Sequence, residues 1–194
     1  MSYIAIVDYG VGNLKSVSNA MEYVGYETRV TSDPQGLERA GAIILPGVGA
    51  FPDAADKLHA SGLDRVLCIQ SEKKPILGIC LGMQLLFDGS NEVRRSKGLG
   101  LVTGWVKRIQ TYRKLPHIGW NSLSFHNNSP LFQGLDDGAF VYFVHGFCGL
   151  PQQEVHVIAR TEYGSSVVAA VSQGNVYGCQ FHPEKSGEVG LQIL

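Results

Sequence analysis

Short apolar runs alternate with stretches of helical periodicity through the first half of the chain. The apolar runs are residues 3–8, 27–30, 42–45 and 75–79. Helical spacing of apolar positions follows at residues 13–24, 52–60, 62–72 and 80–87. Strands that are apolar on both sides are typical of a parallel sheet, because helices bury both of its faces. The first half therefore predicts an open α/β sheet, with Asn13 capping its first helix.

The second half has little helical periodicity and consists of strand patterns separated by turns. Strands are expected at residues 104–109, 121–125, 140–144, 155–160, 167–171 and 176–180. Residues 172–174, Ser-Gln-Gly, are a plausible hairpin loop between the last two. There is no linker, repeat or low-complexity tract. We therefore expect residues 1–194 to form one α/β domain, flavodoxin-like in class, whose mostly parallel open sheet is completed by the β-rich second half.

Composition and charge narrow the class of protein. Hydrophobic residues make up 44% of the 194 residues and charged residues 17%, which is typical of a soluble globular protein. The net charge of −1, with both signs interspersed, does not suggest binding to nucleic acid or to an anionic membrane. Residues 1–8 are too short an apolar run for a signal peptide or a membrane span.

Cysteine usage points to a reducing compartment. The chain has 4 cysteines at unrelated spacings and no Cys-x-x-Cys pair, which fits neither a disulfide framework nor a zinc site. We therefore expect a cytoplasmic protein with free thiols, without a metal or another cofactor.

One cysteine stands between two glycines where a buried strand is expected to lead into a helix. Residues 78–82 read Gly-Ile-Cys-Leu-Gly, with Cys80 at the centre. The pattern favours a nucleophile elbow, the sharp turn that α/β hydrolases build around serine. A thiol at a helix start also lies near the positive end of the helix dipole, which favours the reactive thiolate. On this local pattern alone, a buried structural cysteine is equally plausible.

A histidine and a glutamate follow the last expected strand. Residues 180–184 read Gln-Phe-His-Pro-Glu, and Pro183 biases His182 toward an extended conformation. Residues two apart in extended chain point to the same side, so Glu184 is expected to orient one imidazole nitrogen while the other faces a thiol. Most His-x-Glu pairs lie on surfaces, so this pair gains its weight from Cys80.

Two glycines follow the third expected strand. Residues 46–49 read Pro-Gly-Val-Gly, and their backbone N–H groups suit the stabilisation of an oxyanion. A plain turn between strand and helix is the simpler reading of this segment alone. All three segments follow expected strands, and open parallel sheets bind ligands at the carboxyl ends of their strands. We therefore expect the three segments to meet at one edge of the sheet.

Residues 78–86, Gly-Ile-Cys-Leu-Gly-Met-Gln-Leu-Leu, together with residues 181–184, resemble the class I (triad) glutamine amidotransferases. The resemblance covers essentially the whole chain. It implies a triad of Cys80, His182 and Glu184 that hydrolyses glutamine to glutamate and ammonia through a glutamyl thioester. It also implies the residues that bind the substrate and its oxyanion, namely Gly47, Val48, Gly49, Leu81, Gln84, Glu92, His145, Gly146 and Phe147.

Two of these positions depart from the family pattern. Gly146 and Phe147 stand where a small hydroxyl residue and a tyrosine are usual. Because these positions contact glutamine largely through the backbone, we expect a modest effect on binding. Glu92 suits its implied position electrostatically, since the α-ammonium of glutamine needs an anionic partner. His117 and His145 are expected to be structural or adjacent to substrate rather than catalytic.

Further segments resemble one branch of the family, the glutaminase subunits of imidazole glycerol phosphate synthase in histidine biosynthesis. Val48 is inserted between two glycines that are usually adjacent, and residues 8–13, 116–121, 142–145 and 182–186 fit the same branch. The resemblance implies a (β/α)₈ cyclase subunit as the partner that receives the ammonia. Asn13, Trp120, Asn121 and Lys185 fall on segments that resemble the interface side, although Trp120 fits a core position nearly as well.

Alternative functions remain open on the sequence. The nearest is a glutaminase subunit for anthranilate or aminodeoxychorismate synthesis, which Val48 and residues 116–121 disfavour. A pyridoxal phosphate synthase glutaminase has motifs that are not found here. A non-catalytic homologue is disfavoured by the intact triad, and a flavodoxin-like nucleotide binder by the missing phosphate fingerprint. Cys68, expected on a helix, Cys148, expected in a turn, and Cys179 each lack both an elbow and a base.

Overall fold

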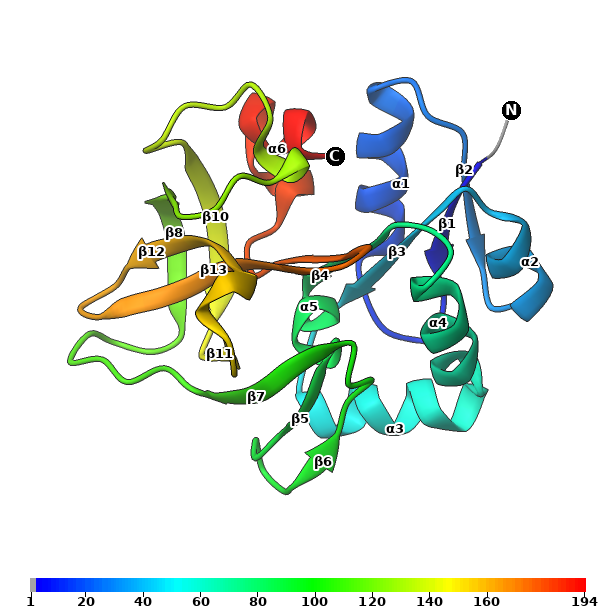
Figure 1. Cartoon of the computed structure of the whole chain (residues 1–194), viewed down its shortest axis with the longest axis horizontal. Coiled ribbons are helices and arrows are strands. Elements are labelled where there is room, and N and C mark those ends of the chain that lie inside the picture. Colours follow the sequence, from blue (N-terminus) through cyan, green and yellow to red (C-terminus); the bar gives the residue numbers. More distant parts are fainter. Residues whose placement is uncertain (1–2) are drawn as a thin grey trace.

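The computed structural model describes residues 3–194. Its centre is an eight-stranded mixed sheet (Figure 1). In spatial order the strands are β2 (Thr28–Thr31), β1 (Ile4–Val7), β3 (Ala42–Gly47), β4 (Ile76–Cys80), β14 (Val176–Cys179), β13 (Ser166–Gln173), β12 (Val157–Glu162) and β9 (Ser124–Phe125). The first five pair in parallel and the last three are joined antiparallel. The open α/β sheet expected from the first half is therefore confirmed.

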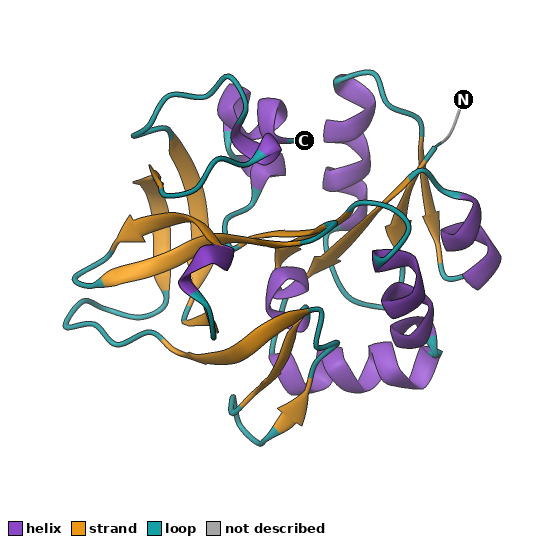
Figure 2. Ribbon diagram, in the orientation of Figure 1, coloured by secondary structure: helices purple, strands orange, loops and turns teal. Residues whose placement is uncertain are grey.

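Helices cover both faces of this sheet (Figures 1 and 2). One face carries α1 (Leu14–Tyr23) and α6 (Gly187–Ile193). The other carries α2 (Pro34–Arg39), α3 (Phe51–Ser61), α4 (Leu63–Ser71) and α5 (Leu81–Leu85). Alternate residues of each central strand supply the two cores, because successive side chains point to opposite faces. Ile6 and Ile44 pack on the α1 side, whereas Val7, Ile43 and Leu45 pack on the other.

The second half does more than complete the central sheet. A two-stranded antiparallel sheet pairs β8 (His117–Ser122) with β10 (Phe140–His145). A four-stranded sheet has the order β11 (Phe147–Pro151), β7 (Val102–Arg108), β5 (Phe87–Ser90) and β6 (Ser96–Lys97). Three 3₁₀ helices, η1 (Pro130–Phe132), η2 (Glu154–His156) and η3 (Pro183–Lys185), complete the described elements. The expected completion of the central sheet by the second half is confirmed for β9, β12, β13 and β14, whereas the other second-half strands form the two further sheets.

Several expected boundaries also change. The helix expected over residues 80–87 ends at Leu85, and Phe87 begins β5. The fully buried ring of Phe87 packs in the core on the α2–α5 side of the central sheet. The strand expected over residues 121–125 is split at buried Leu123, because β8 pairs with β10 whereas β9 pairs with β12 in the central sheet. Asn13 caps α1 as expected, accepting a hydrogen bond from the Ser16 N–H.

The short helix α2 was not expected. Residues 34–39 contain a single large apolar side chain, so no periodicity marks them. Local capping defines the helix instead, since the Asp33 carboxylate accepts from the N–H groups of Gln35 and Gly36. Across residues 3–194, no helix is long and apolar enough to cross a membrane.

Candidate active site

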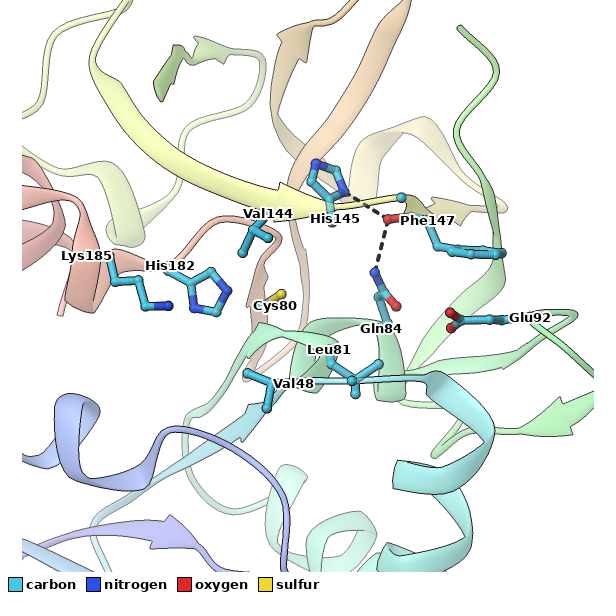
Figure 3. A pocket seen from close by; sticks show the side chains of 12 residues that line it. Val48, Cys80, Leu81, Gln84, Glu92, Val144, His145, Phe147, His182 and Lys185 are labelled. Atoms are coloured by element: carbon cyan, nitrogen blue, oxygen red, sulfur yellow. Dashed lines mark hydrogen bonds between the residues drawn. The ribbon is translucent and has the colours of Figure 1, made fainter. Parts of the chain in front are cut away.

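The three segments expected at one edge of the sheet do meet there. Strands β3, β4 and β14 are neighbours, and Gly47 pairs in register with Cys80 at the ends of β3 and β4. His182 follows β14 closely in the chain. A cavity of about 300 Å³ opens at this edge (Figure 3). Its lining consists of Val48, Gly49, Cys80, Leu81, Gln84, Glu92, Val144, His145, Gly146, Phe147, His182 and Lys185.

Cys80 occupies a strained elbow between β4 and α5. Its φ of 56° and ψ of −111° lie where non-glycine residues are rare, at a typical cost of about 1–3 kcal/mol. The flanking glycines permit the turn. A Cβ at Gly82 would lie 1.8 Å from the Leu45 carbonyl oxygen, and one at Gly78 would lie 2.8 Å from the Gly82 backbone. The elbow geometry expected from the Gly-Ile-Cys-Leu-Gly pattern is thus present.

His182 and Glu184 form a buried pair. Their Nδ1 and Oε1 atoms lie 2.8 Å apart, and the two side chains are only 2% and 1% exposed. The expected reason for this contact was wrong, because residues 183–185 form the 3₁₀ helix η3 rather than extended chain. Pro183 starts that turn, and Ser186 closes it by donating its hydroxyl to the His182 carbonyl oxygen.

The environment of His182 favours its protonated form. Burial would lower the pKa of the imidazole, but the contact with Cys80 and the hydrogen bond to Glu184 outweigh burial and raise it to about 9. Figure 3 shows the imidazole beside the sulfur of Cys80, and Nε2 is buried without a hydrogen-bond partner among residues 3–194. The imidazole beside the Cys80 sulfur therefore carries its proton at pH 7.

The Gly47–Gly49 turn packs tightly against the elbow. A Cβ at Gly47 would lie 2.8 Å from the Gly82 nitrogen and 2.9 Å from the Leu81 side chain, so only glycine fits there. The hydroxyl of Tyr9 donates to the Pro46 carbonyl oxygen over 2.8 Å and fixes the start of the turn. Gly49 has a φ of 101°, which glycine tolerates without strain. Val48 and Gly49 of this turn line the same cavity as Cys80, whereas Gly47 is packed behind them against the elbow and does not line it.

Glu92 reaches the cavity from the segment after β5. Its Oε2 accepts a hydrogen bond of 2.9 Å from the N–H of Phe51, the first residue of α3. The carboxylate thus fills the place of a side-chain cap that the preceding residue, Ala50, does not supply. One oxygen is engaged with the protein, and the side chain still lines the cavity as expected.

A further part of the cavity wall is built from His145, Gly146 and Phe147. The His145 Nδ1 atom lies 2.9 Å from the Phe147 carbonyl oxygen, and the Gln84 Nε2 atom lies 3.0 Å from the same oxygen (Figure 3). His145 also lies 3.2 Å, Nε2 to Nδ1, from buried His117. Burial is the main cause that lowers the pKa of each ring to about 4, so both are neutral at pH 7.

Comparisons with known proteins agree on the family of this chain. The family model described as glutamine amidotransferase class-I matches residues 5–193. The chain belongs to the class I glutamine amidotransferase family. It is 49% identical, over 98% of its length and 91% of the relative's, to the imidazole glycerol phosphate synthase subunit HisH of Bacillus cereus ATCC 14579. A protein of the same name from Caldanaerobacter subterraneus subsp. tengcongensis is 48% identical over 98% and 95% of the two chains.

Solved structures agree with the amidotransferase fold. The structure of PurLQS from Thermotoga maritima superposes with a TM-score of 0.79 at 25% identity, covering 100% of this chain and 96% of that one. A crystal structure of a glutamine amidotransferase gives 0.76 at 21% identity, covering 96% and 94%. The second similarity concerns the fold alone.

One polar residue of this amidotransferase site was not singled out from the sequence. Gln180 is completely buried, and its Nε2 atom lies 3.8 Å from the Cys80 sulfur. Its Oε1 accepts a hydrogen bond of 2.9 Å from Gln84, which is itself buried. The available signal was a glutamine in an apolar strand two residues before His182, since a buried amide needs hydrogen-bond partners.

The four residues expected at the interface lie in different surroundings. Trp120 is 55% exposed and contacts Tyr142 edge-on, so the core reading of this tryptophan was wrong. Lys185 is exposed beside the cavity, and Asn13 is half-buried at the start of α1. Asn121 is also half-buried, and its amide is engaged with the Glu162 carbonyl oxygen and with His117.

The other three cysteines differ from Cys80. Burial raises the pKa of Cys68, of Cys148 (to about 11) and of Cys179, which keeps these thiols protonated. Cys148 lies on strand β11, not in the turn that was expected. Cys179 is fully buried, its thiol donates to the Gly78 carbonyl oxygen, and it does not line the cavity.

Proposed function

We propose that this chain hydrolyses glutamine to glutamate and ammonia with Cys80, His182 and Glu184 as a catalytic triad. The observation that carries the proposal is the thiol of Cys80 at a strained elbow beside the buried His182–Glu184 pair. The Cys80 sulfur attacks the side-chain amide carbon, and His182 gives its proton to the departing ammonia. Water then cleaves the glutamyl thioester, with His182 as the base, and releases glutamate.

Backbone and side chains of the cavity have separate roles in this reaction. The N–H groups of Leu81 and of the turn formed by Gly47, Val48 and Gly49 stabilise the oxyanion of each tetrahedral intermediate. Glu92 binds the α-ammonium of glutamine with the oxygen that Phe51 does not occupy. The remaining contacts to the amino-acid end of the substrate come from Gln84, His145, Gly146 and Phe147.

The ammonia is passed to a (β/α)₈ cyclase subunit, with which this chain forms imidazole glycerol phosphate synthase. Support comes from HisH relatives that are 48–49% identical over 98% of the chain. The cyclase makes imidazole glycerol phosphate and aminoimidazole carboxamide ribonucleotide for histidine biosynthesis. Asn13, Trp120, Asn121 and Lys185 lie on the side that faces the cyclase, and residues 1–194 act as one amidotransferase domain in the cytoplasm.

Glutamate release from glutamine tests this function. The purified chain is assayed alone, with a cognate cyclase, and with the cyclase plus its nucleotide ligand. We expect little release by the chain alone and strong release in the liganded complex. Cys80→Ala removes the nucleophile and abolishes release, whereas Cys68→Ala, a matched control on α4, retains it.

Each other result has a definite meaning. Strong release by the chain alone, unaffected by the cyclase, would remove the partner assignment but keep the glutaminase. No release in any mixture would contradict both. Full release by Cys80→Ala would contradict the triad.

A further inference from the structure

Two hydrogen-bonded glutamines connect the nucleophile to a cavity wall. Gln84 Nε2 donates both to the Phe147 carbonyl oxygen, over 3.0 Å, and to Gln180 Oε1, over 2.9 Å. An amide has one oxygen and one nitrogen, so an engaged Oε1 leaves Nε2 of Gln180 as the atom that faces Cys80. The Gln180 Nε2 to Cys80 Sγ distance is 3.8 Å, within hydrogen-bond range for sulfur. Gln180 is completely buried and Gln84 is 4% exposed, so neither amide is free to turn toward solvent.

Two neutral imidazoles, those of His145 and His117, extend this series of hydrogen bonds beyond the Phe147 carbonyl oxygen. A carbonyl oxygen only accepts, so the His145 Nδ1 atom at 2.9 Å from it carries the proton and Nε2 of that ring accepts. His117 Nδ1, 3.2 Å away, must then be protonated as well. Its Nε2 in turn accepts from the Asn121 amide nitrogen over 3.4 Å. The surroundings thus define one tautomer for both rings.

Stacking and backbone contacts hold the hydrogen-bonded side chains of His117 and Asn121 in place. The His117 ring lies between Phe143, with ring centroids 4.7 Å apart, and Tyr163, at 3.9 Å. The Asn121 amide is fixed at both ends, because its nitrogen also donates to the Glu162 carbonyl oxygen and its oxygen accepts from the Ser122 N–H. Asn121 lies on β8, next to the exposed Trp120.

We propose that Gln180 is a further catalytic residue, whose amide N–H stabilises the Cys80 thiolate, and that the hydrogen-bond chain starting at Asn121 orients this amide. The proposal rests on the glutaminase function proposed above. Asn121, His117 and His145 are positioning residues, which act through the Phe147 carbonyl oxygen and Gln84. The chain also runs from the β8 surface to the nucleophile, so it connects the side that faces the cyclase with Cys80.

The test replaces Gln180 by methionine in the complex with the cyclase. Methionine is close to glutamine in size but cannot donate, so the thiolate loses one charge-assisted hydrogen bond. We expect kcat to fall about ten- to hundredfold and KM for glutamine to change less than about threefold. The pH at which iodoacetamide alkylates Cys80 at half its maximal rate should rise by about one unit.

The alkylation profile separates this role from a structural one. Among the titratable groups around Cys80, His182 is protonated, whereas Tyr9 and Cys179 have raised pKa values and stay neutral, and Gln180→Met replaces none of the three. Gln70→Met is the matched control, since Gln70 is also buried but lies on α4. An unchanged alkylation profile and kcat in Gln180→Met, with the fold intact by circular dichroism, would overturn the role of Gln180.

The hydrogen-bond chain that orients the Gln180 amide is tested in the unaltered protein, so this test does not depend on the folding of a variant. Nitrogen-15 NMR of the histidine side chains should find the proton on Nδ1 and not on Nε2 in both His117 and His145. A proton on Nε2 of either ring would overturn the proposed hydrogen-bond chain. Alkylation and NMR are measured without glutamine, so they remain informative if every mixture fails to release glutamate and the proposed function falls.

Discussion

At the residue scale, the site depends on how three side chains are held around one sulfur atom. Cys80 lines the cavity together with His182, which is paired with Glu184, and the amide nitrogen of Gln180 lies 3.8 Å from the Cys80 sulfur. The imidazole next to the sulfur is protonated at pH 7, because the contacts with Cys80 and Glu184 outweigh burial and raise its pKa to about 9. In the proposed reaction, this imidazolium is the acid that protonates the departing ammonia.

Replacing Glu184 tests the electrostatic part of this arrangement. Glu184→Gln keeps the size of the side chain but removes the charge that helps to hold the proton on His182, so the pKa of His182 should fall from about 9. We expect kcat for glutamine hydrolysis to fall about tenfold or more while KM changes little. The measurements are histidine titration by NMR and steady-state kinetics in the complex. An unchanged His182 titration would contradict the assigned cause.

Single residues differed in how far the sequence could predict them. Cys80 and its glycines could be recognised locally, because the elbow is defined by five consecutive residues. The contact between His182 and Glu184 was predicted correctly although the conformation between them was not. Gln180 could not be assigned, since its orientation depends on Gln84, 96 positions away in the chain.

At the element scale, the elbow depends on the close approach of β3, β4 and α5. Gly47, Gly78 and Gly82 lie where any Cβ would come within 3 Å of backbone from another of these segments or from the turn itself. Glycine is therefore required for packing at these positions, not only for the turn conformation.

A matched pair of substitutions tests this requirement. Gly82→Ala would place a Cβ 1.8 Å from the Leu45 carbonyl oxygen, and backbone on both sides leaves little room to relax. We expect a loss of roughly 3 kcal/mol or more in the free energy of unfolding, together with loss of activity. Gly174→Ala, at a hairpin φ of 60° with open space around it, should cost only about 1 kcal/mol. Similar costs in urea denaturation would contradict the packing account.

The sequence predicted the elements of the first half better than those of the second. Buried parallel strands such as β3 and β4 are continuous apolar runs that can be read locally. The pairing of second-half strands depends on distant partners, as when β11 joins β7 rather than the central sheet. A short element such as α2 carries too few apolar residues to show a period.

At the scale of the whole molecule, buried histidines make stability depend on pH in two opposite ways. His117 and His145 have pKa values lowered to about 4, below the 6.5 of an unfolded histidine, chiefly by burial. The unfolded chain therefore binds more protons below pH 6.5, and their contribution to stability is lost as pH falls from 6.5 toward 4. His182, with its raised pKa, contributes stability that is lost as pH rises from 6.5 through about 9.

Urea denaturation across pH measures the first of these effects. The free energy of unfolding should fall between pH 6.5 and 4, and His145→Asn should make this fall shallower. His126→Asn, a substitution of an exposed histidine in the loop after β9, should leave the slope unchanged. Equal slopes in His145→Asn and in the unaltered protein would contradict the assignment.

The most direct test of the central claim is to find which cysteine reacts with a glutamine analogue. A diazoketone analogue of glutamine, incubated with the complex of this chain and the cyclase, should attach covalently to Cys80 alone, as read by peptide mass spectrometry. Excess glutamine should protect the thiol, because both molecules occupy the same cavity. Labelling of Cys68, Cys148 or Cys179 in place of Cys80, or no labelling at all, would contradict the account.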